Sequence, residues 1–156
     1  LANSLAILLE LGTHEQQHKT LHYMEQIRQQ TSLQLLPQLY PAVEKYDSGW
    51  SELQENCRGT FQNHPHTFHN GGSWVADNCF FGLAQLSQGE QQSASVLLAS
   101  VNEANKKALN GSDWGFYQCH HTKQASPLGT PGYSLSAAGT VLLHQGLADK
   151  ALWFGN

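Results

Sequence analysis

The chain has 156 residues, which suits one domain of ordinary size and is too short for two. Eight Lys and Arg residues against twelve Asp and Glu residues give a formal net charge of −4, and charged residues make up only 13% of the chain. Nucleic-acid binding needs clustered basic side chains that neutralise phosphates, and the densest basic cluster is Lys106-Lys107. We therefore expect no nucleic-acid partner.

A membrane span and a secretory signal are also not expected. The longest apolar run, residues 5–9, falls far short of the ~20 residues that a membrane span needs, and no basic stretch precedes it as in a secretory signal. Three cysteines, Cys57, Cys79 and Cys119, lie far apart, which favours reduced, buried thiols over a disulfide framework. These features predict a cytoplasmic protein with no membrane partner.

Hydrophobic periodicity predicts two helices at the start of the chain. Residues 3–11 are apolar nearly all round and stop at Gly12, which is typical of a buried inner helix. Residues 13–30 begin with Thr13 and Gln16 at the spacing of a capping box and then carry apolar residues at helical spacing among polar ones. This second helix is expected to be an outer, amphipathic one.

The same order recurs downstream. Residues 73–86 are mostly apolar, residues 90–109 have one broad apolar face, and residues 133–145 are small and apolar and stop at Gly146. Residues 147–154 resemble the start of another outer helix. No run alternates apolar and polar residues over the length of a strand, so we predict an all-α fold.

Long connections separate these helical pairs. Residues 31–72 and 110–132 carry Trp, Tyr, Phe and His rather than the Ser, Glu and Lys of disordered segments. We expect both connections to be ordered, to lie at the same end of the helices, and to form the working face of the protein.

Two segments of these connections combine aromatic rings with amide and imidazole groups. They are His69-Asn70-Gly71-Gly72-Ser73-Trp74 and Trp114-Gly115-Phe116-Tyr117-Gln118. Sugar C–H faces stack on aromatic rings, and sugar hydroxyls need short polar partners. The composition of the segments therefore favours a small, uncharged carbohydrate as the ligand, with no cofactor.

At these residues the chain resembles the neutral/alkaline invertases and their bacterial relatives among the (α/α)6-barrel glycoside hydrolases. In that family a His-Asn-Gly-Gly-Ser-Trp-Pro segment opens one inner helix, and a Trp-Gly-Phe-x-Glu or Trp-Pro-Glu segment precedes a Pro-Gly-x-x-x-Ser-Ala-Ala helix. The chain matches the first motif at residues 69–74, with Val75 in place of the proline, and the second at residues 114–116 and 131–138. The resemblance implies helical hairpins that form part of an (α/α)6 toroid, about five or six of its twelve helices, with residues 1–156 as one domain from the C-terminal part of the barrel.

The resemblance also implies an inverting glycoside hydrolase that acts on sucrose or a related small glycoside. Such enzymes pair a carboxylic acid with a carboxylate that serves as general base. The family's base Glu falls at Gln118, two residues after Phe116, and the family's acid Asp lies upstream of anything in this chain. An amide cannot take the proton, so Gln118 is expected to be an inactive base. Asp113, beside Trp114, is the alternative carboxylate, although an Asp before a Trp-Gly turn is more often a local turn former.

The substrate-binding candidates come from both motifs and from one further loop. They are His69, Asn70, Gly71, Gly72, Trp114, Phe116 and Tyr40. Tyr40 belongs to residues 36–41, which resemble a family loop near the substrate. Because about five helices cannot close a barrel, apolar surface would stay uncovered, which soluble monomers rarely tolerate. We therefore expect self-association, or an upstream partner chain that completes the barrel.

Other interpretations remain open. The chain could be a carbohydrate-binding or assembly module that kept the sugar-facing loops and lost hydrolysis. A metal site would draw on His64, His66 and His69 together with His120-His121, but their spacing matches no named zinc pattern, so we predict none. Cys119 beside His120 has the residue types of a nucleophilic pair, although sequence neighbours rarely have the required geometry.

Overall fold

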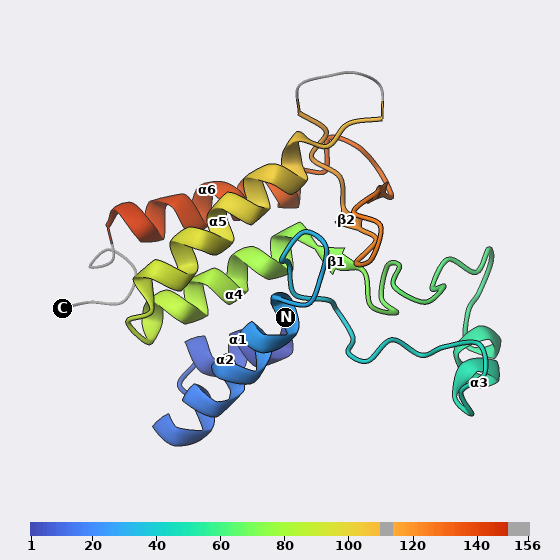
Figure 1. Cartoon of the computed structure of the whole chain (residues 1–156), viewed down its shortest axis with the longest axis horizontal. Coiled ribbons are helices and arrows are strands. Elements are labelled where there is room, and N and C mark those ends of the chain that lie inside the picture. Colours follow the sequence, from blue (N-terminus) through green and yellow to red (C-terminus); the bar gives the residue numbers. More distant parts are fainter. Residues whose placement is uncertain (110–113, 150–156) are drawn as a thin grey trace.

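The computed structural model describes residues 1–109 and 114–149, and its regular structure is mostly helical (Figure 1). The helices are α1 (Ala2–Leu8), α2 (His14–Arg28), α3 (Trp50–Glu55), α4 (Val75–Ser87), α5 (Gln91–Lys106) and α6 (Ser134–Ala148). The strands are β1 (Ser73–Trp74), β2 (Cys119–His120) and β3 (Pro127–Leu128), which form one antiparallel sheet in the order β1-β2-β3. The predicted helical fold is confirmed. The small sheet was not predicted, because two-residue strands are too short to show an alternating pattern.

Helix α2 begins with the predicted capping box. The Thr13 hydroxyl accepts a hydrogen bond from the Gln16 amide at 3.3 Å, and Gln16 Oε1 accepts one from the Thr13 amide at 2.8 Å. These two bonds satisfy amides that the first helical turn would otherwise leave unpaired. The start of α2 is therefore set by the local sequence.

Helix α1 departs from the expectation of burial on all sides. It ends at Leu8, and the next apolar residues, Leu9 and Leu11, are 68% and 61% exposed. Ile7 is buried on the face of α1 that packs against α4. The expectation was wrong for the end of this segment, because no described element covers Leu9 and Leu11.

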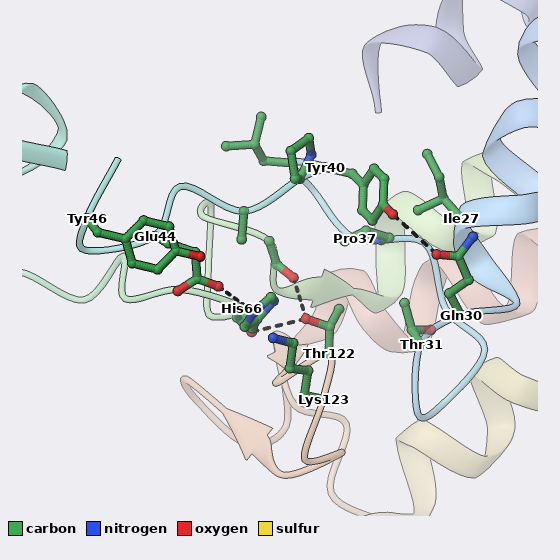
Figure 2. A pocket seen from close by; sticks show the side chains of 14 residues that line it. Ile27, Gln30, Thr31, Pro37, Tyr40, Glu44, Tyr46, His66, Thr122 and Lys123 are labelled. Atoms are coloured by element: carbon green, nitrogen blue, oxygen red, sulfur yellow. Dashed lines mark hydrogen bonds and ion pairs between the residues drawn. The ribbon is translucent and has the colours of Figure 1, made fainter. Parts of the chain in front are cut away.

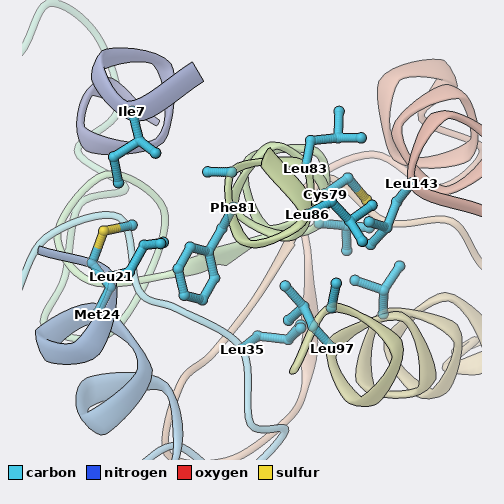
Figure 3. Packing of buried hydrophobic residues seen from close by; sticks show 14 of the residues in the cluster. Ile7, Leu21, Met24, Leu35, Cys79, Phe81, Leu83, Leu86, Leu97 and Leu143 are labelled. Carbon is cyan, nitrogen blue, oxygen red and sulfur yellow. The ribbon is translucent and has the colours of Figure 1, made fainter. Parts of the chain in front are cut away.

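Helix α4 runs through the middle of the hydrophobic core (Figure 3). Helices α1, α5 and α6 all pack against it. Phe81 is fully buried and points toward Leu21 of α2 and Leu35 of the following connection, while Leu97 and Leu143 pack from α5 and α6. Burial of each such side chain contributes about 1.5–3 kcal/mol. The apolar pattern of α4 thus corresponds to a helix with neighbours on most sides, as predicted for an inner helix.

Helix α6 does not stop at Gly146, as the sequence predicted, but continues through it. Gly146 is buried against α4, where a Cβ would lie 2.9 Å from Leu83 Cδ2 and 3.1 Å from Leu86 Cδ1. The glycine therefore permits close helix packing rather than ending the helix. The first two of residues 147–154, expected to start another helix, complete α6, and residues 150–156 lie outside the described residues.

The short and long connections lie at opposite ends of the helices, as predicted (Figure 1). Helices α4 and α6 both begin at the end where the long connections lie. Helix α3, inside residues 31–72, was not predicted, because it has no buried residue and hence no periodic apolar pattern. None of the helices in the described part of the chain has the length and apolar character that crossing a membrane requires.

Candidate functional site

The small sheet joins the two long connections beside the starts of α4 and α6. Strands β1 and β2 pair in antiparallel register, with Ser73 opposite His120 and Trp74 opposite Cys119. Gln118 immediately precedes β2, so the pairing carries it to the N-terminal end of α4. Two motifs separated by about forty residues of sequence therefore meet in space.

The turn before β1 is held together by its own polar groups. Asn70 is only 1% exposed; its Oδ1 accepts from the Val43 amide at 2.7 Å, and its Nδ2 donates to the carbonyls of Val43 at 2.8 Å and Asn63 at 3.1 Å. Gly72 lies against the backbone of Phe68, where a Cβ would be 2.7 Å from the carbonyl oxygen. Asn70 and Gly72 are thus both buried and hold the backbone of this turn in place, and their contact with substrate stays a prediction.

His69 and Trp74 form an aromatic pair at the start of α4. Their rings stack with centroids 4.9 Å apart and an interplanar angle of 17°, and Trp74 Nε1 donates to the Phe68 carbonyl at 3.1 Å. His69 itself is exposed, so its outer face is open to a ligand.

Asp77 lies in the first turn of α4, three residues beyond Trp74. Burial raises the pKa of Asp77, while the interaction with His69 acts in the opposite direction. The site therefore includes a partly buried carboxylate beside His69. Sequence reasoning did not assign Asp77, because it lies within an apolar helical pattern; its position just after the Trp74 motif was the available signal.

Trp114 and Phe116 form the second aromatic pair. Their rings stack with centroids 5.5 Å apart and an interplanar angle of 18°, and Lys106 Nζ lies 5.9 Å from the Trp114 ring. The Asn105 carbonyl at the end of α5 accepts hydrogen bonds from the amides of Gly115 at 2.8 Å and Phe116 at 3.2 Å. Trp114 remains 45% exposed, so the pair presents a ring surface to which the C–H face of a sugar can stack.

Gln118 is held in place by the loop that follows β3. Its Oε1 accepts a hydrogen bond from the Thr130 amide at 3.1 Å, and a Cβ at Gly129 would overlap that same oxygen. Because the oxygen is engaged, the amide nitrogen is the end of Gln118 that can donate to a ligand hydroxyl. Asp113, the alternative carboxylate, lies outside the described residues.

Cys119 and His120 do not have the properties of a nucleophile and its base. Both side chains are fully buried. Burial raises the pKa of the Cys119 thiol to about 12. Burial and the charge of Lys107 lower the pKa of His120 to about 4, against the effect of the Ala104 carbonyl. A protonated thiol out of contact with solvent does not act as a nucleophile.

Tyr40 lines a cavity of about 390 Å³ between the end of α2 and the two long connections (Figure 2). Its hydroxyl donates to Gln30 Oε1 at 3.2 Å. Gly71 also lines this cavity, whereas none of the other described substrate-binding candidates does. The structure thus separates the predicted substrate-binding residues into two places.

The histidines of the two connections are dispersed among other partners. His66 Nε2 lies 3.1 Å from Glu44 Oε1, and the His66 and His121 rings are 5.9 Å apart. The His64 ring packs edge-on against Phe61 with centroids 5.2 Å apart. Within residues 1–109 and 114–149, no three potential metal ligands gather around a common position.

The comparisons with known proteins give a family. A family model described as alkaline and neutral invertase matches residues 1–140. No curated protein matches the chain. The matched span includes both motif segments, Gln118, and all described helices up to the first half of α6. Since the match covers most of the 156 residues, the chain belongs to the alkaline and neutral invertase family.

Proposed function

We propose that the chain forms the C-terminal part of an invertase-type barrel whose site binds sucrose or a related small glycoside, with Gln118 at the position of the catalytic base. The observation that carries the proposal is the fixed amide of Gln118 at the junction of the two family motifs, beside the starts of α4 and α6. The His69–Trp74 and Trp114–Phe116 stacks supply ring surfaces for the sugar. His69, Trp114, Phe116 and Gln118 are the proposed ligand contacts.

In an intact inverting site, the base carboxylate withdraws a proton from a water molecule that attacks the anomeric carbon, and an acid protonates the leaving oxygen. Gln118 can orient such a water but cannot take its proton. Loss of general-base assistance lowers the rate by about 10²–10⁴-fold. In this proposal the acid is supplied from outside these 156 residues, by an upstream segment or partner chain that completes the barrel.

A second candidate function is a carbohydrate-binding or assembly module without hydrolysis. The engagement of Gln118 Oε1 by the Thr130 amide favours it, because that hydrogen bond holds the side chain as a donor toward a ligand hydroxyl. The hydrolase and the carbohydrate-binding module both require sucrose to bind. In the hydrolase, a carboxylate at position 118 should restore turnover, whereas in the module it should not.

The experiment compares the wild-type chain with Gln118→Glu, each alone and mixed with an upstream half of a family barrel. Binding of sucrose is measured by calorimetry and hydrolysis by the release of reducing sugar. We expect the wild-type chain to bind sucrose without turnover, and Gln118→Glu in the presence of the upstream half to raise hydrolysis by about 10²–10⁴-fold.

Gln124→Glu is the matched control, because it adds the same charge at an exposed residue of the same connection. It should leave hydrolysis unchanged. If Gln118→Glu binds sucrose but gains no turnover, the module is favoured over the hydrolase. Turnover by the wild-type chain that Gln118→Ala does not reduce would overturn the placement of Gln118 at the base position.

A further inference from the structure

The cavity around Tyr40 is a second hollow that the proposed invertase site does not use (Figure 2). Its volume of about 390 Å³ falls within the ~300–1,000 Å³ of typical small-molecule sites. Ile27 of α2 and Gln30, just beyond the helix, form one wall, and Thr122 and Lys123 of the second long connection form another. His69, Trp114 and Gln118 do not line it, so the cavity is distinct from the proposed contacts at the starts of α4 and α6.

Aromatic rings flank the cavity. Tyr40 and Tyr46 lie on the same connection, and Figure 2 shows the two rings apart, Tyr46 beside Glu44 and Tyr40 on the side of Gln30. Tyr40 is 47% exposed and Tyr46 is 86% exposed, so a large part of each side chain is open to solvent. The Tyr40 hydroxyl is anchored by Gln30, which holds its ring at the wall near α2. Exposed rings that flank a hollow are surfaces on which the C–H faces of a sugar can stack.

Polar groups line the remainder of the cavity. Glu44 and His66 form a pair in its lining, with Glu44 Oε1 and His66 Nε2 3.1 Å apart, and their side chains are 30% and 20% exposed. The Thr122 hydroxyl donates to the Gly71 carbonyl at 2.8 Å, which ties the second connection to the first at the pocket wall. The partly exposed Glu44 carboxylate can accept hydrogen bonds from hydroxyls, while His66 keeps it in position.

The charges of the lining identify the class of ligand. Glu44 carries one negative charge and Lys123 one positive charge, so the formal charges of the carboxylate and ammonium groups cancel. A site for an anion or a cation would carry an excess of the opposite sign. The lining thus offers aromatic rings together with hydroxyl, amide and carboxylate groups, and its formal charges cancel. Such a lining matches an uncharged polyol.

We propose that the cavity between α2 and the two long connections is a second binding site, separate from the proposed invertase site, for a monosaccharide-sized unit of an uncharged carbohydrate. The sugar occupies the cavity that Tyr40 and Tyr46 line, and its hydroxyls hydrogen-bond to Glu44. The site would hold a second sugar unit close to the proposed invertase site.

The test follows the ring signals of tyrosine by NMR in the full chain during titration with glucose, with gluconate as the anionic probe. We expect glucose to shift the Tyr40 and Tyr46 signals in a saturable manner and gluconate to shift them far less. Tyr46→Ala and Glu44→Gln should each weaken glucose binding about tenfold, the loss that corresponds to ~1.4 kcal/mol. Tyr46 is largely exposed, so its truncation leaves the fold intact.

Tyr23→Ala is the matched control, because Tyr23 is an exposed tyrosine of α2 that does not line this cavity. It should leave glucose binding unchanged. Trp114→Ala separates the two sites: the tyrosine shifts should persist in this variant even where sucrose binding at the invertase site is lost. If glucose leaves the Tyr40 and Tyr46 signals unmoved, or if gluconate shifts them as strongly as glucose, the inference is wrong whatever the fate of the invertase proposal.

Discussion

At the scale of single residues, His120 couples protonation to folding below neutral pH. It lies fully buried in β2, and its pKa falls from an ordinary value of 6.5 to about 4 because burial and Lys107 disfavour the imidazolium. As the pH drops below 6.5, His120 becomes protonated in the unfolded chain, whereas in the folded chain it stays neutral until about pH 4. The contribution of His120 to stability is therefore complete above pH 6.5 and is lost as the pH falls toward 4.

This linkage predicts that His120→Phe reduces the pH dependence of stability. Between pH 7 and pH 5 the wild-type chain should lose about 2 kcal/mol of unfolding free energy through His120, and the variant should lose that much less. Urea denaturation at the two pH values measures the difference. His18→Phe, at an exposed position of α2, is the control and should retain the full wild-type loss. An unchanged pH dependence in His120→Phe would show that His120 is accessible to protons in the folded chain.

Helix α2 is tied to the rest of the molecule by an ion pair at its last turn. The side chain of Arg28 is only 3% exposed; Arg28 binds the Glu25 carboxylate with two nitrogens and donates to the Gln34 carbonyl at 2.8 Å. Gln85 of α4 donates to the same carboxylate at 3.2 Å. Burial alone would raise the pKa of Glu25, but the hydrogen bonds from Arg28, Gln29 and Gln85 and the charge of Arg28 lower it. One ion pair thus links α2, the connection after it, and α4.

We predict that Arg28→Ala lowers the free energy of unfolding by about 3 kcal/mol, because it leaves a partly buried carboxylate and the Gln34 carbonyl without their partner. Chemical denaturation monitored by circular dichroism measures the loss. Lys19→Ala is the control: its ion pair with Glu15 spans 2.6 Å on the same helix, but both side chains are about three-quarters exposed. It should cost less than ~1 kcal/mol. Equal losses of unfolding free energy in the two variants would contradict the prediction that the buried Arg28 ion pair stabilises the fold more than the exposed Lys19 pair does.

At the scale of the whole molecule, the helices leave apolar surface uncovered. Leu9 and Leu11 follow α1 with exposures of 68% and 61%, and Leu135 and Val141 of α6 are each 55% exposed. Exposed apolar residues are ordinary when scattered singly, whereas larger patches mark association surfaces. This exposure supports the proposal that another copy or an upstream chain completes the barrel.

The proposal predicts that the chain self-associates in solution and that the double variant Leu9→Lys, Leu11→Lys shifts it toward the monomer. Placing two ammonium groups in an apolar contact would desolvate them without partners. Sedimentation velocity over a range of concentrations measures the effect. Leu109→Lys, at an apolar residue that is 73% exposed beyond the end of α5, should leave the distribution unchanged. A wild-type chain that is monomeric at all concentrations would leave only an upstream chain as the partner.

Local sequence patterns determined most of the long helices of this protein, but not α3 or the end of α6. The capping box at Thr13, the amphipathic face of α2 and the apolar run of α4 each depend on residues within one or two turns, so spacing alone predicted them. The family was also accessible from the sequence, because its two motifs are short and contiguous, and the match over residues 1–140 confirms it.

Contacts between distant segments were decided only by the tertiary structure. Four features depend on contacts with segments far away in the sequence. They are the pairing of β1 with β2, the burial of the Asn70 side chain, the continuation of α6 through Gly146, and the cavity that Tyr40 lines. The neighbouring element in space decides whether a glycine ends a helix or allows another helix to pack closely against it. It also decides whether a side-chain amide faces a ligand or hydrogen-bonds to the backbone. Periodicity within a segment carries no information about that neighbour, because it reports only which face of the segment is buried.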